Sequence, residues 1–169
     1  MFYRIQQFYY GLFPQITSKD LILIQAYLPE RAISLFTAQL PADQRHCLDV
    51  AQDLLKINPA SLSLSQKNQL IQAALLHDCG KTLYPLKLWQ RVYVVLAAHL
   101  PQLIWDYLKS LSQIQSLSRP LELAKEHPKW GAELSAQAGL EEEVVQLIRF
   151  HHTPKSEVGN LLYLADNRH

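Results

Sequence analysis

The chain has 169 residues, of which 49% are hydrophobic, and it carries a formal net charge of +1. This length allows one domain with a sizeable core, and the charge gives no electrostatic reason to expect specific nucleic-acid binding. The two cysteines, Cys47 and Cys79, form neither a disulfide framework nor a CxxC zinc motif, so a cytoplasmic location is expected.

The N-terminal residues 1–40 are expected to form a helical extension packed on the core. Residues 1–13 are rich in aromatic side chains, but Gln6, Gln7 and Pro14 interrupt them and no small-residue cleavage site follows, which argues against a signal peptide. The first helix is predicted over residues 18–28, with Thr17 or Ser18 as its cap, and a short one over residues 29–39.

Apolar positions recur at steps of three and four throughout the chain, and no stretch shows strict alternation. The sequence therefore predicts an all-α fold. A helix over residues 42–57 places Val50 and Leu54 on the face of His46, so this histidine points inward. The next helix, residues 66–78, is expected to stop at Gly80 through a left-handed conformation.

Residues 88–108 are the most membrane-like part of the chain, but polar residues interrupt them well short of the ~20 apolar residues that a transmembrane helix needs. An amphipathic helical pair is therefore favoured over a transmembrane segment, with weak membrane contact as the alternative. Pro128 is predicted at the first position of a helix that Gly139 closes, which places His127 at its N-terminal edge. The last helices are expected over residues 141–152 and 158–167.

The most informative motif is the His77-Asp78 pair, which follows an apolar helical run and precedes Gly80 and Lys81. Adjacent residues on a regular helix point ~100° apart, but a turn at the glycine allows both side chains to reach one centre. Imidazole nitrogens and carboxylate oxygens from different helices are the ligands that divalent transition metals take. The candidate metal ligands are His46, His77, Asp78, His127, His151, His152 and Asp166.

From about residue 35 to 166, the chain resembles the HD-domain superfamily of metal-dependent phosphohydrolases. His46, His77, Asp78 and Asp166 match the H…HD…D residues of its first metal site. His127, His151 and His152 resemble the histidines that hold a second metal in some members, beside a bridging aspartate that corresponds to Asp78. The segment from His77 to Lys81 is similar to HDIGK, with Cys79 in place of isoleucine. The match is closest to the branch with the HD-GYP phosphodiesterases, but Thr153-Pro154-Lys155 follows the histidine pair where Gly-Tyr-Pro would be.

The resemblance implies a single-domain helical bundle over residues 41–169, with residues 82–126 as a helical insertion near the site. It also implies hydrolysis of a small phosphomono- or phosphodiester, nucleotide-like, by a water molecule activated at a dinuclear site. Asp78 and Lys81 are the expected catalytic residues, and Lys81 and Arg91 the expected substrate contacts. Two divalent metals are implied, and manganese, iron, nickel, cobalt and zinc all suit these ligands.

Several alternatives remain open from the sequence. The same ligands suit a di-iron oxygenase of the HD type, and the domain could instead be a non-catalytic module that binds a nucleotide or a partner. Lys81 could simply cap a helix, and His127, His151 and His152 could interact with helix dipoles. Residues 82–126 could form an ordinary packed hairpin. His99 and His169 are interpreted as ordinary surface histidines, and the oligomeric state is left open.

Overall fold

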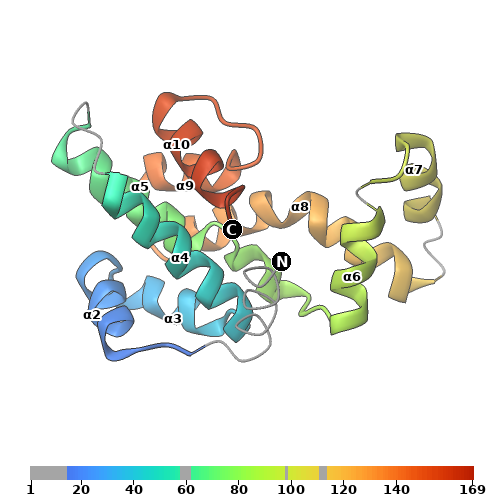
Figure 1. Cartoon of the computed structure of the whole chain (residues 1–169), viewed down its shortest axis with the longest axis horizontal. Coiled ribbons are helices and arrows are strands. Elements are labelled where there is room, and N and C mark those ends of the chain that lie inside the picture. The colour runs from blue at the N-terminus through green and yellow to red at the C-terminus, as the bar shows by residue number, and fades with distance from the viewer. Residues whose placement is uncertain (1–14, 58–61, 98, 111–113) are drawn as a thin grey trace, which may run out of the picture.

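The computed structural model describes residues 15–57, 62–97, 99–110 and 114–169, and all regular structure in these ranges is helical (Figure 1). The predicted all-α fold is therefore confirmed, whereas the interpretation of residues 1–14 lies outside the described part of the chain. In chain order, the elements are α2 (Ser18–Tyr27), α3 (Glu30–Ala38), α4 (Pro41–Ile57), α5 (Leu64–Leu76), the 3-10 helix η1 (Cys79–Leu83), α6 (Leu88–Ala97), α7 (Gln102–Ser110), α8 (Gln115–Gln137), α9 (Glu142–Arg149) and α10 (Glu157–Asp166).

Helices α2 and α3 pack on the main bundle. Helix α2 begins with a capping box in which Thr17 and Asp20 each accept a hydrogen bond from the other's backbone, as the predicted cap requires. Ile24 of α2 and Phe36 of α3 are buried in the same apolar core as Leu48 of α4. The described part of residues 1–40 thus contributes to the core of the domain.

The core lies among α4, α5, α9 and α10. Helices α4 and α5 run side by side, α9 packs against α5, and α10 packs against both α4 and α5 (Figure 1). Leu54, Leu75, Ile148 and Leu162, one from each helix, are almost completely buried there. These four helices carry most of the predicted metal ligands or end next to them.

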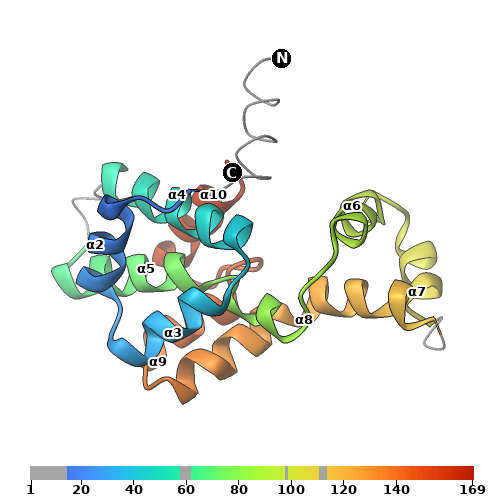
Figure 2. The same ribbon diagram turned by 90° about the horizontal axis from the view of Figure 1, so that it is seen from below.

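Helices α6 and α7 project from this body together with the N-terminal half of α8 (Figure 2). The predicted amphipathic pair over residues 88–108 is observed, with bounds of Leu88–Ala97 and Gln102–Ser110. Its apolar side chains include Val95 and Leu103, which are 60% and 84% exposed. No helix among the described residues is both long enough and apolar enough to cross a membrane.

The predicted helix start at Pro128 is wrong, because α8 runs without interruption from Gln115 to Gln137 with Pro120 and Pro128 inside it. The insertion boundary expected at residue 126 also falls within this helix. Proline in a helix removes one N–H, which leaves the carbonyl four residues earlier without its helical partner. In α8, side chains supply the missing donors.

The carbonyl of Ala124, freed by Pro128, accepts from His127 Nδ1 at 3.1 Å. The carbonyl of Ser116, freed by Pro120, accepts from Gln90 Nε2 at 3.2 Å. Both replacements satisfy a buried or partly buried acceptor that would otherwise destabilise the helix. The periodicity of the sequence does not show that a side chain will replace a missing backbone donor. The Gln90 donor, for example, comes from another helix.

The predicted left-handed conformation of Gly80 is also wrong, because Gly80 lies within the 3-10 helix η1 and the described glycine with positive φ is Gly139, at 81°. Gly80 is required for a different reason. A Cβ atom at this position would lie 2.1 Å from the carbonyl oxygen of His127 and 2.6 Å from the nitrogen of Gly131. The small residue therefore allows η1 to contact the backbone of α8, which brings Asp78 close to His127.

Candidate metal centre

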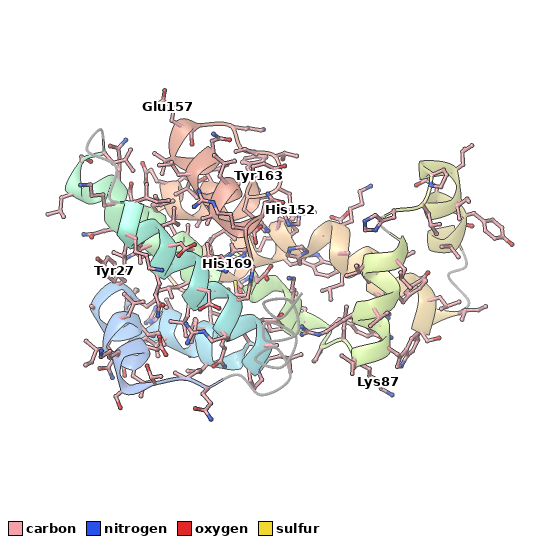
Figure 3. All side chains as sticks on the ribbon, in the orientation of Figure 1. Tyr27, Lys87, His152, Glu157, Tyr163 and His169 are labelled. Carbon is pink, nitrogen blue, oxygen red and sulfur yellow. The ribbon has the colours of Figure 1, made fainter. Side chains whose placement is uncertain are left out.

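Five segments of the chain bring the seven predicted ligands together. His46 comes from α4 and His77 from the end of α5, whereas His127 lies in the middle of α8 and Asp166 is the last residue of α10. Asp78 lies between α5 and η1 with φ −96° and ψ 1°, so the chain turns directly after His77. His151 and His152 were predicted within a helix but occupy the turn after α9, and His152 faces α8 (Figure 3).

His46, His77 and Asp166 form the first group of donor atoms. His46 Nε2 lies 2.9 Å from Asp166 Oδ1 and 3.3 Å from His77 Nε2. His77 Nε2 is 3.5 Å from the same carboxylate oxygen. The three donors therefore surround one point, as three ligands of a single ion would.

His127, His151 and His152 form the second group, and their donor atoms all lie within 4.8 Å of one another. The ring of His151 is 5.1 Å from that of His77 in the first group, measured between centroids. The two groups are thus adjacent.

Asp78 lies between the two groups. Its Oδ2 atom is 3.8 Å from His77 Nε2 and 3.9 Å from His46 Nε2, whereas its Oδ1 atom is 3.4 Å from His127 Nε2. One carboxylate oxygen thus faces each group, which is the arrangement that a bridging carboxylate needs in a two-metal site.

Backbone carbonyls fix the orientation of three of the rings. The Nδ1 atoms of His77, His127 and His151 lie 2.7–3.0 Å from the carbonyl oxygens of Ala74, Leu123 and Ile148, respectively. A carbonyl only accepts, so Nδ1 carries a proton in each ring, and Nε2 is the nitrogen directed at the centre. This is the support that metal-binding histidines usually receive.

Two further observations indicate that these residues could bind a metal ion. His127 Nε2 and His151 Nε2 are buried, and neither has a hydrogen-bond partner among the described residues. A buried polar atom without a partner is costly, and coordination of an ion would satisfy both. Two donors that are each about 2.1 Å from one ion lie about 3–4 Å apart, and the donors within the first group are separated by similar distances.

The electrostatics of the site also favour cation binding. Burial opposes ionisation of Asp78, but Lys81, His77 and His127 outweigh it and hold the pKa of this carboxyl well below its usual value. Desolvation and the neighbouring His127 lower the pKa of His152 to about 4, and desolvation also lowers that of His151. Near neutral pH both rings are therefore uncharged, which is the form that coordinates metals.

A third cluster, made of Cys47, His77 and Asp78, is a poorer metal site. Cys47 Sγ lies 3.8 Å from His77 Nδ1, the atom whose proton is already donated to the Ala74 carbonyl. Burial raises the pKa of the Cys47 thiol, and it raises that of Cys79 to about 12. Both cysteines are thus buried thiols rather than thiolate ligands.

A cavity of about 350 Å³ opens beside the centre and is lined by His127, His152, Lys81 and Arg91, among others. Lys81 Nζ is 2.6 Å from Asp78 Oδ2. Arg91 comes from α6 and forms two hydrogen bonds, of 3.0 and 2.7 Å, with the carboxylate of Asp43 on α4. Asp43 is not among the candidates that the sequence predicts, since an acidic residue in the first turn of a helix is ordinary.

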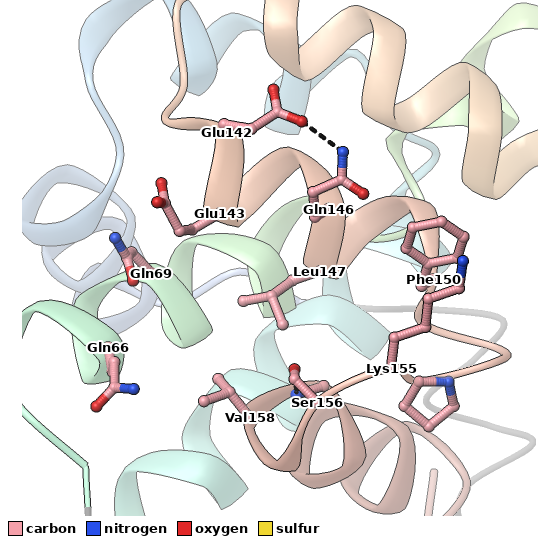
Figure 4. Close-up of a pocket in the computed structure, with 12 residues that line it drawn as sticks. Gln66, Gln69, Glu142, Glu143, Gln146, Leu147, Phe150, Lys155, Ser156 and Val158 are labelled. Atoms are coloured by element: carbon pink, nitrogen blue, oxygen red, sulfur yellow. Dashed lines mark hydrogen bonds between the residues drawn. The ribbon is translucent and has the colours of Figure 1, made fainter.

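A second cavity, of about 410 Å³, lies between α5, α9 and the start of α10 (Figure 4). None of the seven candidate ligands lines it, and its Lys155 ammonium lies over the ring of Phe150 at 3.7 Å. His99 is exposed, and His169 pairs with Asp53 at 2.9 Å, so both lie outside the centre as predicted. The seven clustered ligands therefore define the candidate site.

Comparison with known proteins connects this geometry to one family. The family model described as "HD domain" matches residues 44–169, and this range includes all seven candidate ligands. No curated protein and no solved structure matches the chain. Because the family match spans most of the sequence and includes the metal-ligand arrangement described above, the chain belongs to the HD domain family.

Proposed function

We propose that the protein is a metal-dependent phosphohydrolase that cleaves a small phosphomono- or phosphodiester at a dinuclear centre. HD domains are generally metal-dependent phosphohydrolases, which supports the reaction class. The observation that carries the proposal is the position of Asp78, whose two oxygens face two separate groups of histidines. His46, His77 and Asp166 would hold one metal, and His127, His151 and His152 the other.

Two metals held in this way supply an activated water molecule and neutralise negative charge on a phosphate. The chain keeps the donors in place, because backbone carbonyls hold the His77, His127 and His151 rings with Nε2 toward the centre. The bound ester would lie in the adjacent 350 Å³ cavity, where Lys81 and Arg91 are available to contact phosphate oxygens. Lys81 is already beside the bridging carboxylate, so its charge would act close to the reacting phosphorus.

The test begins with the metal content per chain, measured by plasma mass spectrometry on protein purified without chelator or nickel resin. We expect two equivalents in the wild type and a lower content in both His77→Ala and His127→Ala. His99→Ala is a matched control, since this exposed histidine lies outside the centre and its loss should leave the content unchanged.

The same preparations are then assayed for hydrolysis of p-nitrophenyl phosphate and bis(p-nitrophenyl) phosphate. Turnover that is lost in His77→Ala and retained in His99→Ala would support the proposal. Iron with substrate-dependent oxygen uptake would instead favour the oxygenase. Absence of bound metal after reconstitution would favour a non-catalytic module.

A further inference from the structure

The cavity beside the centre has an apolar wall that the metal ligands do not explain. Leu86, Val94 and Val95 contribute to it from the segment after η1 and from α6, and Leu123 and Ala124 contribute from α8. Half of the ten lining residues are thus aliphatic. Such a wall stabilises an aliphatic group by removing it from water.

The polar lining residues are already engaged. Asp43 and Arg91 pair with each other through two hydrogen bonds, and Lys81 pairs with Asp78. The two histidines of the lining, His127 and His152, belong to the candidate metal centre. The cationic groups can still receive phosphate oxygens, since a guanidinium carries five donors and an ammonium three.

Among the described residues, the lining contains no serine, threonine, asparagine, glutamine, phenylalanine, tyrosine or tryptophan side chain. A nucleobase presents several donors and acceptors on its edges, and burying them without partners is unfavourable. It also gains from stacking on an aromatic face, and no Phe, Tyr or Trp side chain is available here. Among the described residues, a base would therefore find no Phe, Tyr or Trp face here, and the charged side chains of the lining are already paired.

We propose that the substrate is a phosphoester of an aliphatic alcohol, with its phosphate toward Lys81 and its hydrocarbon body against the apolar wall. This inference rests on the proposed function, because it assigns a substrate class to the same site, in place of the nucleotide-like compound expected from the sequence. Ala124 sets the depth of the pocket in this arrangement, since a larger side chain at that position would fill it.

The apolar surface continues beyond the cavity along α6. Val95 lines the cavity and is also 60% exposed, and Val92 and Leu96 of the same helix are 52% and 65% exposed. A hydrocarbon chain that fills the pocket can therefore extend onto the exposed apolar side chains of this helix. The substrate class includes alcohols longer than the pocket itself.

The experiment measures binding and turnover across a series of chain lengths. Isothermal titration calorimetry on the protein with its metals would give the Kd of methyl-, butyl-, hexyl- and octylphosphonate, which cannot be hydrolysed at a P–O ester bond. We expect Kd to fall about three- to fourfold for each added methylene until the pocket is filled. The matching n-alkyl phosphates should show the same trend in kcat/KM, and adenosine and uridine 5′-monophosphates should be no better than ethyl phosphate.

A pair of variants on α8 tests the pocket wall directly. In Ala124→Leu, Kd should stop falling at an alkyl chain that is shorter by about two or three methylenes than in the wild type. Ala136→Leu makes the same change on the same helix at an exposed position outside the cavity and should leave the series unaltered.

The outcomes separate this inference from the proposed function. Hydrolysis of phosphoesters with no dependence on chain length, or a clear preference for the nucleotides, would overturn the aliphatic substrate class and leave the hydrolase intact. A steep dependence of Kd on chain length without turnover of any ester would support the pocket assignment and contradict hydrolysis. If Ala124→Leu and Ala136→Leu behave alike, the pocket assignment is wrong.

Discussion

Among single residues, Asp20 connects the N-terminal helices to the body through a buried carboxylate. It accepts from the Thr17 backbone at 2.8 Å, from Arg45 Nη1 at 2.9 Å and from Gln52 Nε2 at 2.7 Å. Burial opposes its ionisation, but the Thr17 donors and Arg45 outweigh burial and lower its pKa. Its charge therefore stabilises the folded state at neutral pH.

We expect Asp20→Asn to reduce the free energy of unfolding at pH 7 by roughly 1–3 kcal/mol, because it weakens a helix cap and a partly buried ion pair. A carboxyl whose pKa is lower in the folded state stabilises above its unfolded pKa and loses that contribution as the pH falls through the folded value. The gap between wild type and variant should therefore shrink below about pH 4. Urea unfolding at several pH values measures this difference in the free energy of unfolding.

The control for this prediction is Asp49→Asn, which removes another partner of Arg45 whose side chain is 40% exposed. Its effect should stay below about 1 kcal/mol, as for other exposed ion pairs. Equal effects of the two substitutions at pH 7 would contradict the role assigned to Asp20.

Arg91 is the second residue with a testable role. Arg91→Ala should raise KM for p-nitrophenyl phosphate while the metal content stays unchanged, because the residue lines the cavity but is not a ligand. An increase of about tenfold corresponds to the loss of one charged hydrogen bond. Steady-state kinetics and plasma mass spectrometry measure the two quantities.

Asp43→Asn distinguishes two possible roles of Arg91, which are contact with the substrate and attachment of α6 to α4. Asp43 is the residue with which Arg91 forms an ion pair. If Arg91 acts on the phosphate, this substitution leaves the guanidinium in place and KM should not rise. A similar rise in both variants would show that the pair only holds α6 against α4.

Among the secondary-structure elements, α8 contains a proline that matters for the metal centre. Pro128 has no N–H, and the carbonyl that it frees, that of Ala124, accepts from His127 Nδ1. The proline thus helps to keep His127 Nε2 directed at Asp78, from which it lies 3.4 Å. Pro128→Ala would restore a backbone donor that competes with the histidine for this carbonyl.

Pro128→Ala should lower the affinity for the second metal by about tenfold, as expected when a supporting hydrogen bond of a ligand is weakened. The free energy of unfolding of the metal-free protein should not decrease, because the helix gains a backbone hydrogen bond. Metal titration and urea unfolding test the two parts. Pro120→Ala, on the same helix but near Gln90, is the matched control and should leave metal affinity unaltered.

For the molecule as a whole, the centre joins five segments that span residues 46–166, so metal binding should stabilise the entire fold. At a free metal concentration of 100 times Kd, the gain is about 2.7 kcal/mol per site. For a chain of this size we expect each occupied site to raise Tm by roughly 5–10 °C on adding manganese or zinc to chelated protein. Magnesium should give a much smaller rise, since histidine nitrogens suit it poorly.

Differential scanning calorimetry measures this effect, with His127→Ala and His99→Ala as a pair. His127→Ala should lose part of the rise, and His99→Ala should keep all of it. A Tm that does not respond to any transition metal would contradict the proposed centre.

The sequence by itself determined the helical fold and the set of candidate ligands. A cap at Thr17 or Ser18 predicts the start of α2, and the spacing of apolar residues predicts α4 and α5 to within a few residues, because capping and periodicity are local properties. The His77-Asp78 pair was recognisable since the two residues are adjacent and Gly80 and Lys81 follow within three positions.

Only the tertiary structure decided how these ligands are supported and what surrounds them. Pro128 continues α8 because a histidine side chain replaces the lost donor, and Gly80 is needed because η1 approaches the backbone of α8. The Asp43–Arg91 pair and the apolar wall of the cavity join residues that are far apart in the chain. Such contacts depend on how the helices pack, and the local pattern of residues carries no information on them.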